Sequence, residues 1–349
     1  MIVLGIETSC DETSAAIVSS NKKILSNVIS SQIDIHKPFG GVVPEIASRS
    51  HVQNIDEVIR ISLQKANVQL EKVDAIAATA GPGLIGGLIV GLLASKSMAL
   101  SINKPLIGIN HLEAHALMPR LTNKIVFPYL LLLVSGGHTQ ILEIHGVRKY
   151  KLIGTTLDDA CGECFDKVAK MLDLGFPGGP AIENAAKFGD DEAIELPRPM
   201  INHLTLDFSF SGLKTAVLGK IADTMSEKIK NNIAASFQKS IGDILYKKIE
   251  KASNNFYKNY SYKPNIVFSG GVASNQYLKN RLLNLSELNK VSFYAPPREL
   301  CTDNGAMIAY AGLERYERNL FSKLTFKPRP RWPLDKKALF MKGKRVSGA

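Results

Sequence analysis

The sequence predicts an α/β protein built from two duplicated halves. Residues 3–18 and residues 131–144 each consist of an apolar stretch, a tight turn of small residues and a second apolar stretch, which is the pattern of a β-hairpin. The two segments lie about 128 residues apart. Further strand–turn–helix patterns follow in each half, and alternating strands and helices indicate α/β layers. The sequence therefore predicts two related lobes that each open on a hairpin.

The first half continues with a strand at residues 73–78, a Gly-Pro-Gly turn at 81–83 and a helix at 84–100. Residues 75–95 carry no charge, a length that would also suit a membrane span. The turn interrupts this stretch, so we expect a strand and a buried helix instead. A strand at 105–109 then leads into two histidines.

The second half repeats the pattern near its end. A strand at 265–268 leads through a glycine turn at 269–271 into a helix from about Asn275, and a last helix covers about 304–318. We expect an N-terminal lobe at 1–125, a C-terminal lobe at 126–322 and an extended basic segment at 323–349.

Composition and charge limit the classes of protein. With 45% hydrophobic and 21% charged residues, the chain can build sizeable cores. Its four cysteines do not suggest a disulfide framework, and no cationic leader precedes the first apolar run, so we expect a cytoplasmic protein without a membrane anchor. Residues 323–349 carry nine Lys or Arg and one Asp, which is most of the net charge of +11. This segment is either a solvated tail or an arm that contacts nucleic-acid phosphates.

Three glycine turns stand in the second half, at 135–139, 177–180 and 269–271. Backbone N–H groups in such turns can hold an anion, although a single glycine turn is more often structural. None of the turns matches the P-loop or the dinucleotide fingerprint, which argues against P-loop ATPases and Rossmann dehydrogenases.

Polar side chains stand beside the turns: Asp11 in the first hairpin, then Asp166, Glu183 and Asn275. Each could be a turn residue or a helix cap, and Ser274-Asn275 is a natural cap. In a nucleotide site, the carboxylates would bind ribose hydroxyls and the amide could read adenine.

The stretch GINHLEAHA at 108–116 places His111 and His115 one helical turn apart. It resembles the zinc-protease motif H-E-x-x-H, but Glu113 is one position late and points away from the histidine face. Asn110 and Glu113 instead suit a capping box. The histidines are either partly buried core residues or two ligands of one metal, and Asp303 is available as a third ligand unless it caps the last helix. Cys161-x-x-Cys164 is interpreted as a pair of small buried residues.

Several motifs occur in order along the chain and together resemble one family, the tRNA threonylcarbamoyl adenosine transferases of bacteria and organelles, or TsaD family. They are GIETSCDETS at 5–14, GVVPE at 41–45, GPG at 81–83, HxxxH at 111–115, VSGGHT at 134–139, FSFSGLK at 208–214 and CTDNG at 301–305. The likeness covers about residues 1–334. The family was once labelled a sialoglycoprotein endopeptidase.

The resemblance implies an actin/sugar-kinase/Hsp70-like (ASKHA) fold, with two duplicated lobes around a central cleft. It implies an acyltransferase that moves the threonylcarbamoyl group from threonylcarbamoyl-AMP to N6 of adenosine 37 in tRNAs that read ANN codons. It also implies partners: a non-catalytic paralogous subunit and an ATPase in bacteria, or a second copy of the chain in organelles.

The resemblance assigns residues as well. The metal ligands would be His111, His115 and Asp303, holding iron or zinc, with iron preferred. The substrate and nucleotide contacts would be Val134, Ser135, Gly136, Gly137, His138, Asp166, Gly179, Glu183 and Asn275. We expect Asp11 to orient or deprotonate the amine of the adenosine. The rival hypotheses are an ASKHA-type ATPase or kinase and a non-catalytic scaffold subunit.

Overall fold

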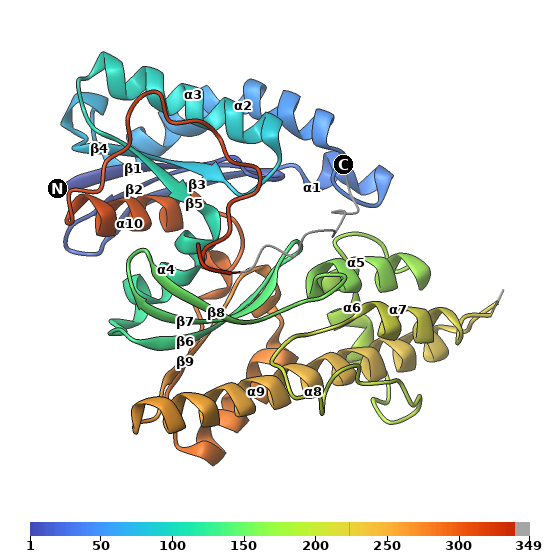
Figure 1. Ribbon diagram of the computed structural model, residues 1–349. Helices are drawn as coiled ribbons and strands as arrows, with labels where there is room; N and C mark the ends of the chain where they lie inside the picture. The colour runs from blue at the N-terminus through green and yellow to red at the C-terminus, as the bar shows by residue number, and fades with distance from the viewer. Residues whose placement is uncertain (223, 339–349) are drawn as a thin grey trace. The chain divides into compact units, whose positions relative to one another are not determined.

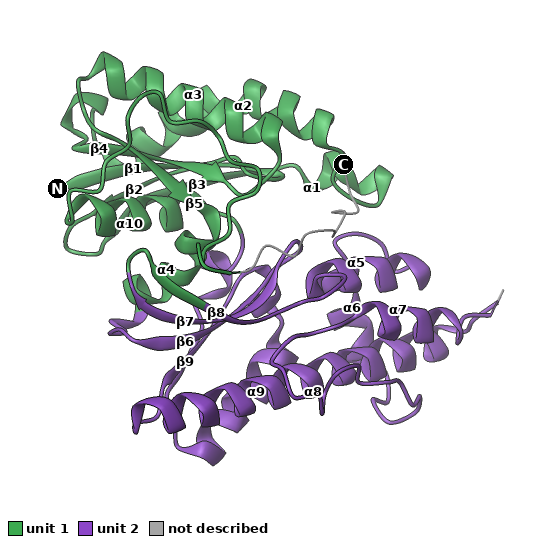
Figure 2. Ribbon diagram, in the orientation of Figure 1, with its two compact units in different colours: residues 1–122, 147–151, 303–349 green, residues 123–146, 152–302 purple. Residues whose placement is uncertain are grey.

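The computed structural model describes residues 1–222 and 224–338, which form two compact units (Figures 1 and 2). Unit 1 contains residues 1–122, residues 147–151 and the described residues from 303 on. Unit 2 contains residues 123–146 and 152–302.

A mixed five-stranded sheet forms the centre of unit 1, in the order β3-β2-β1-β4-β5. The first hairpin pairs β1 with β2 in antiparallel fashion from Ile2↔Ser19 to Glu7↔Ser14, whereas β4 and β5 run parallel to β1. The carboxyl ends of β1, β4 and β5 therefore meet at one edge of the sheet. The strands are β1 (Ile2–Glu7), β2 (Glu12–Ser19), β3 (Ile24–Ser31), β4 (Ala75–Gly81) and β5 (Leu106–Asn110).

The second five-stranded sheet has the order β10-β9-β6-β7-β8. Its hairpin pairs β6 with β7 from Tyr129↔Ile144 to Val134↔Thr139, and β9 runs parallel to β6. Taken from its other edge, this sheet has β8, β7, β6, β9 and β10 at the places of β3, β2, β1, β4 and β5 in the first sheet. This equivalence confirms the predicted duplication. The strands are β6 (Tyr129–Val134), β7 (Thr139–Gly146), β8 (Lys149–Thr155), β9 (Asn265–Ser269) and β10 (Phe293–Tyr294).

Helices cover both faces of the sheet in unit 1 (Figure 1). Helices α2 and α3 pack on one face, while α10 packs on β1, β2 and β4. Gly5 lets α10 approach β1, because a side chain at this position would overlap the backbone of Ala309. The helices are α1 (Ile33–His36), η1 (Lys37–Phe39), α2 (Pro44–Ala66), η2 (Leu70–Lys72), α3 (Ile85–Ser101), α4 (His111–Asn123) and α10 (Gly305–Tyr316).

The core of unit 2 is made by β6 and β9 together with helices α5, α6, α8 and α9. Helix α8 is the longest of these and packs against both α6 and α9. The elements are α5 (Cys161–Met171), α6 (Gly178–Ala186), α7 (Ser211–Leu218), α8 (Glu227–Tyr260), η3 (Gly271–Ser274), α9 (Gln276–Asn289) and η4 (Arg298–Leu300).

The division of the chain differs from the expected lobes at its end. Residues 303–322 were expected in the C-terminal lobe, but α10 packs on the sheet of unit 1. The reason is the apolar face of α10, which includes Ala306, Ile308 and Ala309 and is fully buried. The uncharged stretch 75–95 forms β4 and the start of α3, as predicted. Among the described residues, no helix is long and apolar enough to cross a membrane.

The segment after α10 is tied along the edge of unit 1 by its backbone. Ser322 N donates to Leu106 O at 2.8 Å and Arg329 N donates to Ala80 O at 2.7 Å. The Arg329 guanidinium lies 4.8 Å from the ring centroid of Phe326 and 5.0 Å from that of Trp332. The described residues from Ser322 to Leu334 therefore form a strap on unit 1. The expected basic segment continues through residues 339–349, which lie outside the described residues.

A buried ion pair joins α4 to α10. Arg315 donates Nε to Glu113 Oε1 at 3.1 Å and Nη2 to Glu113 Oε2 at 2.5 Å, and its Nη1 donates to Gly108 O at 2.7 Å. Both side chains are nearly inaccessible, at 9% for Arg315 and 2% for Glu113. Loss of one partner would leave the other charge buried and unpaired.

We predict that Arg315→Met destabilises the chain by about 3–5 kcal/mol, because it strands the Glu113 carboxylate. Chemical denaturation measures this loss. The double variant Arg315→Met, Glu113→Leu should recover much of it, since apolar residues of similar volume can replace a buried pair. A single variant as stable as the wild type would contradict the argument.

Candidate functional site

The two histidines lie where β5 ends and α4 begins. Asn110, the last residue of β5, caps the helix, because its Oδ1 accepts from Leu112 N at 2.9 Å and from Glu113 N at 3.3 Å. The expected return contact from the Glu113 carboxylate to the cap was wrong, since that carboxylate pairs with Arg315. The cap still sets the start of the helix, and the rings of His111 and His115 lie 4.8 Å apart.

Asp303 completes a set of three donors from two distant parts of the chain. Its Oδ1 lies 3.0 Å from His115 Nε2 and 3.4 Å from His111 Nε2. The three ligand atoms fall within 4.8 Å of one another. Asp303 does not cap α10, because Asn304 does so by accepting from Met307 N at 3.0 Å. Two imidazoles and one carboxylate suit a divalent metal that keeps open coordination positions, so the residues fit the expected group.

A buried glutamate orients His111 from behind. Glu7, at the end of β1, accepts from His111 Nδ1 at 3.1 Å and from Thr79 Oγ1 of β4 at 2.5 Å through Oε2. Its Oε1 accepts from Ser9 N at 2.5 Å. A carboxylate that holds the far nitrogen of a histidine leaves Nε2 directed at the metal position. Burial lowers the pKa of His111, but Asp303 and Glu7 outweigh it and raise that pKa to about 9.

The turn between β1 and β2 adds further carboxylates. Asp11 lies in this turn, and Glu12 follows it as the first residue of β2. Burial, followed by the charges of Asp11 and Asp303, raises the pKa of the Glu12 carboxyl well above its usual range. Glu7, Asp11, Glu12 and Asp303 thus make the edge of unit 1 strongly acidic, which favours a cation and disfavours a phosphate.

The glycine turns of unit 2 gather at the matching edge of its own sheet. The turn Ser135–His138 follows β6, and Gly270 follows the parallel strand β9. Gly270 has φ +97° and packs directly on the carbonyl of Val134. In contrast, a β-carbon at Gly136, Gly137, Gly179 or Gly271 would meet no atom within 4 Å. These four positions leave their backbone open to a ligand, as phosphate binding requires.

The polar residues predicted for the nucleotide join the helices around these turns. Asp166 Oδ1 accepts from Gly178 N at 2.7 Å, and Glu183 Oε1 accepts from Gln276 N at 2.7 Å. Asn275 caps α9 by accepting from Leu278 N at 2.9 Å and donates to Gln238 Oε1 at 2.8 Å. Each therefore has a structural role in unit 2, and contact with a nucleotide stays a prediction for all three.

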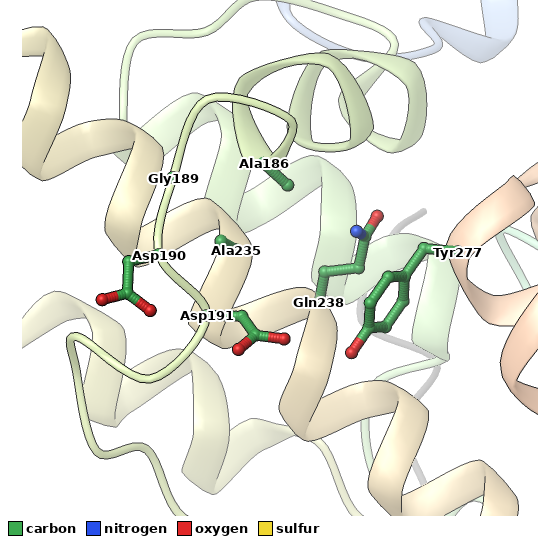
Figure 3. A pocket seen from close by; sticks show the side chains of 7 residues that line it. All are labelled: Ala186, Gly189, Asp190, Asp191, Ala235, Gln238 and Tyr277. Carbon is green, nitrogen blue, oxygen red and sulfur yellow. The ribbon is translucent and has the colours of Figure 1, made fainter.

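A cavity of about 290 Å³ lies on the same helices (Figure 3). It is lined by Asp190, Asp191, Gln238 and Tyr277, and by Ala186, Gly189 and Ala235. Gln238, which lines this cavity, accepts the hydrogen bond from Asn275 Nδ2. Because two aspartates line it, the cavity would repel a phosphate, and the open glycines are the better place for that group.

The two cysteines of the CxxC motif are both buried in the core of unit 2, as interpreted from the sequence. Burial raises the pKa of the Cys164 thiol to about 12. Burial also raises the pKa of Cys161 well above its usual range. These thiols are therefore poor nucleophiles and poor metal ligands.

The sequence reasoning missed Glu7 and Thr79 as supports of the site. A signal for Glu7 was present, since it is the one charged residue of the otherwise apolar strand IVLGIE. Thr79 gave no comparable signal within the alternating apolar and small residues of β4.

Comparison with known proteins decides the family. Residues 23–310 match the family model TsaD, described as tRNA N6-adenosine threonylcarbamoyltransferase. A protein of that name from Bartonella bacilliformis is 51% identical over 362 residues, covering all of both chains. Another from Rickettsia canadensis is 52% identical over 337 residues, covering 95% of this chain and 98% of the relative. The chain belongs to this family.

Solved structures of distant proteins show the fold. The structure of T. kodakarensis HypF has a TM-score of 0.61 at 14% identity, covering 92% of this chain and 48% of HypF. The (R)-2-hydroxyglutaryl-CoA dehydratase component A of Acidaminococcus fermentans has a TM-score of 0.52 at 14% identity, covering 91% of this chain and 99% of that protein. These likenesses, with the two equivalent sheets, confirm the ASKHA-type fold of the TsaD family member.

We predict that His111→Ala and His115→Ala each abolish stable metal binding, because two remaining donors do not hold a divalent ion against dialysis. Metal content per chain after dialysis, measured by mass spectrometry, checks this. His203→Ala is the matched control, since His203 is an exposed histidine of unit 2. Metal retained at the wild-type level in either variant would exclude the three-donor site.

Proposed function

We propose that the chain transfers the threonylcarbamoyl group from threonylcarbamoyl-AMP to N6 of adenosine 37 in tRNAs that read ANN codons. Its membership of the TsaD family makes it a tRNA N6-adenosine threonylcarbamoyltransferase. The observation that carries the proposal is the convergence of His111, His115 and Asp303 beside an acidic turn, since neither a sugar kinase nor a scaffold needs this donor set.

The chemistry requires an activated carbonyl, because an exocyclic aromatic amine is a poor nucleophile. AMP provides a good leaving group. A divalent metal held by His111, His115 and Asp303 would supply a Lewis acid and a template for the acyl group. The open backbone at Gly136, Gly137, Gly179 and Gly271 would hold the phosphate and stabilise the charge that leaves with AMP.

The proton of the amine needs an acceptor, and we assign it to Asp11. Asp11 lies in the turn between β1 and β2 beside Glu12, whose carboxyl pKa is raised by burial and by the charges of Asp11 and Asp303. Asp11 would thus orient or deprotonate the attacking amine.

We propose one metal per chain and prefer iron to zinc. Two histidines and one carboxylate with open positions are the ligand set of many non-haem iron sites, although catalytic zinc uses similar sets. The four cysteines are unpaired, which suits a reducing compartment, and we propose the cytoplasm.

The proposed partners include tRNA, threonylcarbamoyl-AMP and further proteins. Helix α3 exposes Ile85, Ile89 and Leu93 at 48%, 40% and 54%. These residues recur every four positions, so they form an apolar stripe on one helix face. We propose this stripe as the contact for a non-catalytic paralogous subunit, with an ATPase as a further partner in the bacterial arrangement. In the organellar arrangement a second copy of the chain would take that place.

The transfer of labelled threonine to tRNA, with the partner synthase and accessory proteins supplied, tests the function. We predict transfer by the wild-type chain and a loss of about 10²-fold or more in Asp11→Asn, in the range of general base catalysis. Asp56→Asn is the control, because Asp56 is exposed on α2. Turnover of ATP on a small alcohol without a tRNA product would instead favour a kinase.

The strap is the proposed contact for tRNA phosphates outside the metal site. The strap and the described residues directly after it expose six cationic side chains, those of Lys323, Lys327, Arg329, Arg331, Lys336 and Lys337. Among the described residues, none of these six side chains forms an ion pair. The strap also contacts the cap of α4, the helix that carries the two histidines, because Asn110 Nδ2 donates to Trp332 O at 2.9 Å. Cations held in this place could meet the phosphates that flank adenosine 37.

We predict that Lys323→Gln, Lys327→Gln, Arg331→Gln reduces the slope of log Kd for tRNA against log salt by about 2 to 3, since each lost phosphate contact removes roughly 0.7–0.9. Arg329 is kept because it stacks on Phe326 and Trp332. The control triple is Lys23→Gln, Lys65→Gln, Lys72→Gln, at exposed lysines elsewhere on unit 1. Equal slopes for the two triple variants would indicate that the strap is a solvated segment that does not contact tRNA phosphates.

A further inference from the structure

The turn that carries Asp11 has its backbone carbonyls held by three separate donors. Ser9 O accepts from Leu84 N at 2.8 Å and Asp11 O accepts from Gln32 N at 3.0 Å. Between them, Cys10 O accepts from His51 Nε2 at 3.0 Å. Two of these donors are backbone groups, and the third is the side chain of His51. The position of the turn therefore depends on one imidazole that can be changed by mutation.

The contacts of His51 determine which nitrogen carries its proton. A carbonyl can only accept, so Nε2 must donate to Cys10 O. In a neutral ring with its proton on Nε2, the Nδ1 atom accepts from Thr13 Oγ1 at 2.8 Å, with Gln32 Nε2 at 3.4 Å beside it. Burial lowers the pKa of His51 and supports the same state.

The network continues away from the turn. His36 Nε2 donates to Gln32 Oε1 at 3.1 Å, because His36 Nδ1 accepts from Val43 N at 3.3 Å. Gln32, His36 and His51 are all almost completely buried. The ring of His51 also fits closely against α3, where a β-carbon at Gly87 would lie 2.9 Å from its Nε2. The imidazole thus has one orientation, and that orientation places the turn.

We infer that His51 is a positioning residue for the transfer reaction, acting through the Cys10 carbonyl on Asp11 and Glu12. Within the part of the chain that the structure describes, its hydrogen bonds go to Cys10, Thr13 and Gln32 and not to the metal ligands or the proposed substrate loops. The inference rests on the proposed role of the Asp11 turn. An alternative role for His51 is packing alone, in which case the hydrogen bond to Cys10 would not affect catalysis.

Two substitutions separate the bond from the packing. In His51→Gln, the side-chain nitrogen lies as far beyond Cγ as Nε2 does, so it keeps the donor to Cys10 O. In His51→Asn, the amide reaches only the Nδ1 position, so it keeps the acceptor for Thr13 and loses the bond to Cys10 O. Both variants remove the ring and both lose packing on α3.

We predict that His51→Asn lowers kcat for threonylcarbamoyl transfer by about tenfold or more, because a small displacement of a reacting group has effects of this size. The KM for tRNA should change by less than about threefold, since the phosphate contacts are unaffected. His51→Gln should retain kcat within about threefold of the wild type. The assay uses the full chain with the synthase and accessory proteins, and metal content is measured in parallel and should equal the wild-type value.

Ser62→Ala is the matched control for lost stability. Ser62 lies on α2, as His51 does, and its buried hydroxyl bonds Ser26 Oγ at 2.8 Å, away from the turn. It should lower the unfolding midpoint and leave kcat unchanged. If His51→Asn behaves like Ser62→Ala, or if His51→Gln loses as much kcat as His51→Asn, the inference is overturned.

A second variant covers the case in which neither substitution at His51 folds. Thr13→Val keeps the shape of the side chain and removes the hydroxyl that holds Nδ1 of the ring. It should lower kcat in the same direction by about threefold. An unchanged kcat in this variant overturns the inference. An inactive wild-type chain would instead refute the proposed function, so the two failures are distinguishable.

Discussion

The rest of the site depends on the hydrogen bonds that the buried carboxylate of Glu7 accepts. It lies at the end of β1 and accepts from the turn that follows β1, from Thr79 of β4 and from His111 after β5. One buried group thereby joins the ends of three parallel strands. A buried carboxylate is stable only when its oxygens are satisfied, so these three elements cannot move separately. The orientation of His111 is a consequence of the sheet.

Duplication of one architecture gives the two units different chemistry at equivalent places. In each sheet the first hairpin and the neighbouring parallel strands bring loops to one edge. In unit 1 those loops end in carboxylates and histidines, which suit a cation. In unit 2 the same edge ends in glycines with open space around them, which suits an anion. The two units thus differ in the charge of the ligand that each one suits.

The sequence predicted features that depend on local order. The hairpins, the strand–turn–helix units and the cap at Asn275 were confirmed, because periodicity and capping act over a few residues. The pairing of Glu113 with Arg315 was not predicted, since the two lie 202 residues apart. The contacts of Thr79 with Glu7 and of His51 with Cys10 were not predicted for the same reason, because each joins residues far apart in the sequence. For Asp303 the sequence left two roles open, a third ligand or a cap of the last helix, and the resemblance to a family favoured the ligand.

The ion pair of Glu113 with Arg315 explains why a sequence that resembles a protease motif has a different chemistry. A peptidase of the H-E-x-x-H type needs its glutamate beside the metal-bound water as a base. Here Glu113 points to the opposite side of α4 and is neutralised by Arg315 in the interior. The carboxylates that do face the histidines are Glu7 and Asp303, and both are engaged with the rings. Asp11 and Glu12 belong instead to the turn between β1 and β2, whose position depends on other residues. In the proposed mechanism the helix would therefore provide ligands, and the group that handles the proton would come from another part of the sheet edge.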